Sequence, residues 1–189
     1  MRVANPPKRS AWSALALFLI GLSAQAQCVV FKSEITDVKD YEITVGSITD
    51  SLKVVAETAA FAARYSEGMT NARQAEQLAG KALAAAQEAV NYAAEAQYHA
   101  EVCGLKDVVS HAIKAEALAV DTRDFADIAY TSAKKARSAR SLGDVHYFMR
   151  QSLVAARNAS RTSEKAIYAA YDAHQSCTHT DGDATVGRN

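Results

Sequence analysis

Alanines recur through most of this chain at alternating steps of four and three residues. Residues spaced in this way lie on one face of an α-helix, so each unbroken series predicts a long helix with a seam of small side chains. Three such series run from Ala75 to Cys103, from Ala112 to Ala136 and from Ser152 to Cys177. Their members are Ala75, Ala79, Ala82, Ala86, Ala89, Ala93, Ala96, Ala100 and Cys103; Ala112, Ala115, Ala119, Thr122, Ala126, Ala129, Ala133 and Ala136; and Ser152, Ala156, Ala159, Ser163, Ala166, Ala170, Ala173 and Cys177.

A fourth series precedes these three and has larger side chains in its first half. It predicts a further helix, with a weak point at Gly46, where Ser47 and the residues after it could form a capping box. Its seam is predicted to be Val38, Tyr41, Val45, Ile48, Leu52, Val55, Ala59, Ala62 and Ser66.

Glycines and capping residues predict short turns between the four helices. Short turns make consecutive helices antiparallel neighbours, so the predicted fold is all-α: an antiparallel up-down-up-down four-helix bundle with alanine-rich heptad seams. Larger residues beside the seams are expected to supply most of the buried apolar area, among them Ile113, Phe125 and Ile128. The predicted breaks are Gly68 with Thr70, Gly104 with Asp107, and Ser141 with Asp144.

The first 26 residues have the pattern of a secretory signal peptide. Basic residues precede an apolar run from Ala11 to Leu22, and Ala24 and Ala26 stand at the two positions that a signal peptidase reads. The run is shorter than an ordinary transmembrane helix. We therefore expect a signal peptide over 1–26, a bundle domain over 27–177 and a disordered tail over 178–189, with no membrane span after cleavage.

The predicted export places the protein in the periplasm or outside the cell, where thiols are oxidised. The chain has three cysteines, and the predicted topology brings Cys28, Cys103 and Cys177 to one end of the bundle. The first helix is adjacent to both the second and the fourth, so Cys28 should belong to any close pair. The expected disulfide joins Cys28 to Cys177, with Cys28 to Cys103 as the alternative.

Histidines gather at the same end and offer a second interpretation. Imidazole and thiolate groups are ligands of zinc and copper, so a metal-binding bundle is the alternative to a disulfide-clamped one. A disulfide would consume two of these thiolates, and their spacing matches no standard zinc finger. The candidate ligands are His99, Cys103, His174, Cys177 and His179.

Enzyme chemistry finds little support in the sequence. No glutamate has a histidine three residues later, as a ferritin-like di-iron site requires, and no phosphate-binding glycine loop or hydrolase motif is present. An alanine core also leaves little room for a large cofactor. We therefore expect no enzyme and no cofactor, but a structural or binding role toward an unidentified protein or envelope partner.

Charge and surface patterns bound the choice of partner. The chain has 21 basic and 21 acidic residues, so nothing indicates nucleic-acid binding. Basic residues crowd the end of the third predicted helix, where a solvated face or an anionic partner would explain them. A bundle that left an alanine seam open would instead form a homo-oligomer. The basic residues are Lys134, Lys135, Arg137 and Arg140.

Overall fold

The computed structural model describes residues 11–104 and 106–186, and it describes side chains between Cys28 and Cys177. It contains four α-helices joined by short turns. They are α1 (Ala11–Ala60), α2 (Tyr65–Cys103), α3 (Lys106–Arg137) and α4 (Leu142–Val186).

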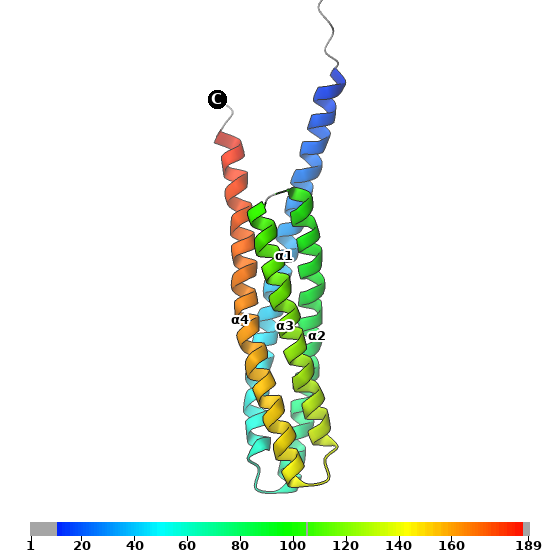
Figure 1. The fold of residues 1–189 in the computed structure, drawn as a ribbon, viewed down its shortest axis with the longest axis vertical. Helices are drawn as coiled ribbons and strands as arrows, with labels where there is room; N and C mark the ends of the chain where they lie inside the picture. Colours follow the sequence, from blue (N-terminus) through cyan, green and yellow to red (C-terminus); the bar gives the residue numbers. More distant parts are fainter. Residues whose placement is uncertain (1–10, 105, 187–189) are drawn as a thin grey trace, which may run out of the picture.

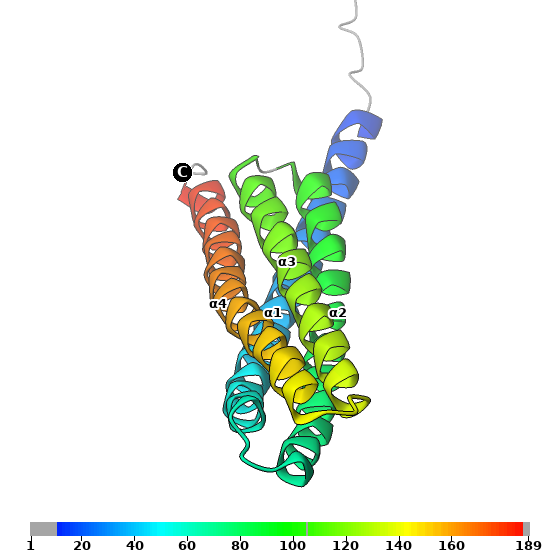
Figure 2. The same cartoon turned by 60° about the horizontal axis from the view of Figure 1, so that its bottom comes forward.

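The four helices form the predicted bundle, with consecutive helices running in opposite directions (Figure 1). Each helix packs against its two neighbours around the bundle, while the diagonal pairs α1 with α3 and α2 with α4 make few contacts. The α1–α2 and α3–α4 turns lie together at one end (Figure 2), and the α2–α3 turn lies at the other. An apolar cluster at the latter end joins all four helices; its members include Phe31, Ala100, Val108 and Cys177.

The core consists mainly of alanine, as the seams predict. Every predicted seam residue of α3 and α4 is buried, and so is every one of α2 except Cys103, which is half-buried. A methyl group fills little space, so the helices can approach closely, and each position buries little apolar area. The bundle therefore depends on many small contacts repeated over long helices.

The predicted seam of α1 is wrong by one residue at three positions between Val38 and Ala59, and its last predicted member, Ser66, is exposed in α2. Val38, Val45 and Leu52 are fully buried as expected, but the positions between them are occupied by Glu42 and Thr49. The bulkier predicted residues are only partly buried, at the side of the seam. The prediction preferred the larger apolar side chains, whereas the helix buries the polar side chains of Glu42 and Thr49. The displaced residues are Tyr41, Ile48 and Val55.

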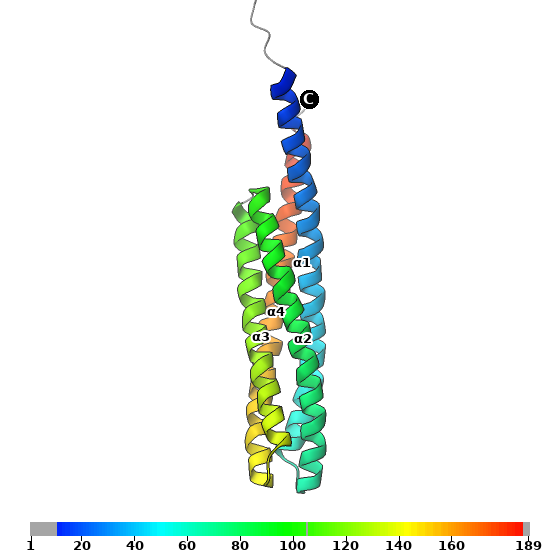
Figure 3. The same cartoon turned by 90° about the vertical axis from the view of Figure 1, so that its right-hand side faces the viewer.

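Helix α1 is continuous through Gly46, so the predicted capping box there does not form. The hydroxyl of Thr49 instead donates to the main-chain oxygens of Val45 and Gly46, inside an unbroken helix. The N-terminal part of α1 and the C-terminal part of α4 both extend past the α2–α3 turn (Figure 3). Within the part of the chain that the structure describes, no helix is long and apolar enough to cross a bilayer.

Helix α4 is longer than predicted. It continues to Val186, so residues 178–186 of the predicted tail are helical, and 187–189 lie outside the described residues.

Two of the three predicted turns are confirmed. Gly104 has a φ of 69°, a left-handed conformation that suits glycine, and its N–H donates to the oxygens of Ala100 and Glu101. The Ser141 hydroxyl accepts a hydrogen bond from the main-chain N–H of Asp144 and donates one to its carboxylate, which caps α4.

The first turn was placed wrongly. Gly68 does not end α1 but is buried in the first turn of α2, and Thr70 caps no helix. Space is tight here, because a Cβ at this position would lie 3.2 Å from Cγ1 of Val145 and the valine would have to shift to admit it.

Close packing of the alanine core can be tested by enlarging one seam residue of α2. Ala86→Leu inserts three carbons into the seam and should lower the free energy of unfolding by about 1–3 kcal/mol, because the helices must move apart. Urea denaturation measures this change. Ala84→Leu, at an exposed position two residues away, is the matched control. Equal stability of the two variants would contradict close packing at Ala86.

Candidate functional site

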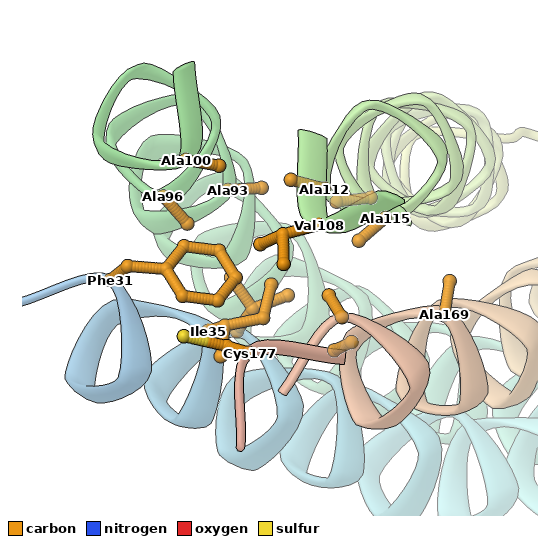
Figure 4. Close-up of a cluster of buried hydrophobic side chains, with 14 of the residues drawn as sticks. Phe31, Ile35, Ala93, Ala96, Ala100, Val108, Ala112, Ala115, Ala169 and Cys177 are labelled. Atoms are coloured by element: carbon orange, nitrogen blue, oxygen red, sulfur yellow. The ribbon is translucent and has the colours of Figure 1, made fainter. Parts of the chain in front are cut away.

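The structure brings two of the three cysteines into contact with one apolar cluster. Cys177 of α4 is buried in it, beside Phe31 and Ile35 of α1 (Figure 4), and half-buried Cys28 packs against the same cluster. Cys103 is half-buried at the end of α2. This placement agrees with the predicted gathering of the cysteines, while the pairing of Cys28 with Cys177, or with Cys103, stays a prediction.

The candidate metal ligands do not assemble among the described side chains. Nε2 of His99 lies 3.3 Å from Oε1 of Glu34, so this imidazole contacts a carboxylate across the α1–α2 interface. His174 is half-buried on α4, and the side chain of His179 lies outside the described residues. No three His, Cys, Asp or Glu side chains of the described set lie close enough together to hold a metal ion.

Glu34 is nearly buried and ionises less readily than a solvated carboxyl. Loss of water raises its pKa, His99 lowers it, and the negative charges of Glu95 and Asp37 raise it further. Its second oxygen, Oε2, is buried without a hydrogen-bond partner in the structure as described. The Glu34–His99 contact therefore joins α1 to α2 in the half of the bundle nearer the α2–α3 turn.

Glu42 is the most unusual residue of the interior. Its side chain is fully buried, and neither carboxyl oxygen has a hydrogen-bond partner among the described residues. Loss of water, the larger cause, raises the pKa of the Glu42 carboxyl to about 8, and the Ser163 hydroxyl offsets only part of this rise. That hydroxyl donates to the main-chain oxygen of Glu42 at 2.6 Å. At neutral pH the buried carboxyl is thus mostly protonated.

Small polar residues mark the level of Glu42 in the bundle. Val38 belongs to the apolar cluster on one side of Glu42, and Val45 belongs to the next cluster on the other side. Thr122 of α3 and Ser163 of α4 are both fully buried at the corresponding gaps in their seams. The apolar core is therefore interrupted here by one carboxyl and two hydroxyl groups.

An apolar groove lies on the outside of the bundle, between α3 and α4. It has a volume of about 800 Å³, within the range of small-ligand sites, and it is partly open to solvent. Ile128 is 50% exposed there and Val154 is 57% exposed. Ile128 was expected to pack inside the bundle, so its exposure corrects that prediction.

The residues that line the groove repeat at helical spacing on both walls. On α3 the steps are three, four and three residues, and on α4 they are four, three and four. A hydrogen bond from the Ser152 hydroxyl to the Ala129 main-chain oxygen, 3.0 Å long, fixes the register of the two helices behind the groove. The stripes are Phe125, Ile128, Ser132 and Lys135 on α3, and Tyr147, Gln151, Val154 and Asn158 on α4.

The two ends of the groove carry opposite charge. Lys135 and Arg150 line the end near the α3–α4 turn, and Asp127 lines the part nearer the middle of the bundle. The Lys135 ammonium lies 6.0 Å from the centre of the Phe148 ring, and the Arg150 guanidinium lies 5.4 Å from that of Phe61. Contacts of this kind hold a cation over an aromatic face. Neither Phe148 nor Phe61 lines the groove, so these two contacts hold the cations against rings outside its lining.

Two further hollows, of about 630 Å³ each, lie between α2 and α3 and have a different character. Charged and amide side chains form much of their lining, and in one of them Arg137 and Glu76 approach to 3.0 Å. Charged groups that already pair with each other leave less for a ligand to bind. The α3–α4 groove is therefore the stronger candidate.

No family model, curated protein sequence or solved structure matches this chain.

Sequence reasoning missed both Glu42 and the groove. A search that allowed polar residues at the steps of four and three from Val38 would have found Glu42, because this register places it in one seam with Val45, Leu52 and Ala56, all of them buried. The groove has a signal on α3 too, since Phe125 and Ile128 each precede a seam alanine by one position.

The buried carboxyl gives a prediction on pH dependence. The unfolded chain releases the Glu42 proton near pH 4.5 and the folded protein near pH 8, so stability should fall as pH rises between these values, at about 1.4 kcal/mol per pH unit from this group. Glu42→Gln should remove this slope and be more stable than the wild type at pH 8. Urea denaturation from pH 4 to pH 9 measures both effects.

Glu164→Gln, an exposed neighbour of Ser163, is the control and should leave the slope unchanged. A Glu42→Gln profile parallel to that of the wild type would contradict the assignment.

The thiols give a second prediction. Intact mass of the exported protein, before and after reduction and alkylation, should show a chain that begins at Gln27, one reducible bridge, one alkylatable thiol and no metal ion. Peptide mapping should assign the bridge to Cys28 and Cys177. Three thiols that alkylate without reduction, together with a bound zinc or copper ion, would reject the disulfide and favour the metal-binding alternative.

Proposed function

We propose that this protein is an exported, non-enzymatic helical bundle that binds another protein of the periplasm or the extracellular space through its α3–α4 groove. The observation that carries the proposal is the groove itself: the exposed side chains of Ile128 and Val154 line it together with Phe125 and Tyr147. Exposed apolar patches with a polar rim are typical of interaction sites.

The nature of the core supports a surface role. Small side chains fill most of the seams of α2, α3 and α4, so the interior offers a ligand little volume. The groove, in contrast, is formed by two packed helices whose backbones need not move to accept a partner. A preformed surface of this kind binds with little loss of conformational entropy.

Export supports the choice of compartment. The pattern of basic residues, apolar run and small residues before Gln27 is that of a cleaved leader. The predicted disulfide at the Cys28 end suits the same compartment.

A photo-reactive amino acid at Gln151, inside the groove, tests the proposal in the cells that export the protein. The matched control is the same amino acid at Gln74, exposed on α2 away from the groove. We expect an adduct of one defined mass from position 151 and none from position 74. Val154→Glu should abolish the adduct, because it places a charge in the stripe, whereas Val54→Glu, at a 66% exposed valine of α1, should not.

Two results would reject the proposal. One is the absence of any specific adduct from position 151. The other is an adduct with twice the mass of the chain, which would assign the groove to self-association.

A further inference from the structure

We infer that the occupant of the α3–α4 groove is an amphipathic helix of about three turns, with acidic residues at the end that lies against Lys135 and Arg150. This inference rests on the proposed function and names the chemistry of its partner.

The periodicity of the walls argues for a helix. Both walls present side chains at steps of three and four residues, in the same pattern that forms the seams inside the bundle. Two antiparallel helices with such facing stripes form a row of holes for the side chains of a third helix. An apolar helix face would therefore continue the packing of the bundle outward, as in helix-in-groove recognition.

The length of the stripe sets the length of the occupant. From Phe125 to Lys135 the α3 wall rises about 15 Å, at 1.5 Å per residue, which matches three turns of a partner helix. Beyond this stretch the next residues in the same register are Asp121 on α3 and Arg161 on α4, both exposed. Charged residues thus bound the apolar part on the side away from the turn.

Charge sets the chemistry of one end. Lys135, close to the C-terminal end of α3, and Arg150 of α4 both line the groove. Asp127 disfavours acidic groups at the other end of the groove. An occupant with acidic residues at its end near Lys135 would form ion pairs there without meeting the aspartate.

Shape argues against a second copy of the chain as the occupant. A copy that docked through the same surface would place one concave groove against another, and the space between them would stay unfilled. A separate helix supplies the ridge that the groove lacks.

Two fluorescent peptides of about twelve residues test the inference. Both carry the same apolar stripe, and they differ only in having two glutamates or two lysines in the last turn. Fluorescence anisotropy measures their binding to the full-length exported protein. We expect the glutamate peptide to bind about tenfold more tightly at low salt, and the difference to shrink in 0.5 M salt, roughly where charge interactions are screened within a few ångströms.

Charge reversal on the protein makes the test specific. The double variant Lys135→Glu with Arg150→Glu should prefer the lysine peptide, and the neutral pair Lys135→Gln with Arg150→Gln should show no preference. Val154→Glu should lower the affinity for both peptides at least about tenfold, because it disrupts the shared apolar contact. Val54→Glu should leave both affinities unchanged. Circular dichroism verifies that each variant is folded.

The outcomes separate the inference from the function on which it rests. Equal binding of the two peptides, with both lost in Val154→Glu, would overturn the acidic occupant and keep the groove as a binding surface. A preference that survives the double charge reversal would overturn the role of Lys135 and Arg150. Failure of both peptides to bind would overturn the helical occupant, and the adduct from position 151 would then decide the function of the groove independently.

Discussion

Close contact between alanine seams is the interaction on which the rest of this structure depends. A methyl group is the smallest side chain that still excludes water from a helix interface, so four long helices can pack with narrow spacing and little internal volume. Bulky apolar residues beside the seams then have limited room inside. Some of them, Ile128 and Val154 among them, lie on the outer surface. The narrow interior and the apolar groove are two results of the same packing.

The same core makes the burial of Glu42 informative. A carboxyl without a hydrogen-bond partner is stable in an apolar interior mainly as the neutral acid. Ser163, whose hydroxyl donates to the Glu42 main chain, and Thr122, buried at the corresponding gap in the α3 seam, are both small. A protonatable group therefore lies in the middle of the bundle, close along α3 and α4 to the end of the groove that is away from the α3–α4 turn.

Sequence periodicity predicted most of the fold and little of the site. The seams of α2, α3 and α4 were predicted correctly because every seam position holds a small residue, so no second face of these helices offered such a series at the same spacing. In α1 two adjacent faces share the same spacing, and the bulkier face was chosen although Glu42 and Thr49 point inward. Packing decided that register, since a narrow core admits one glutamate more easily than a row of large side chains. The capping of α4 by Ser141 depended only on local sequence and was predicted correctly.

The continuity of α1 has a consequence for the exported form. In the structure this helix begins at Ala11, so the proposed cleavage after Ala26 would fall within a helix and not in a loop. The remaining part, 27–60, has 60 − 26 = 34 residues, close to the 32 residues of α3. Its first buried residue would then be Phe31, about one turn from the new terminus. Maturation would thus trim the longest helix to the height of the bundle, with its new amino group near the thiol of Cys28.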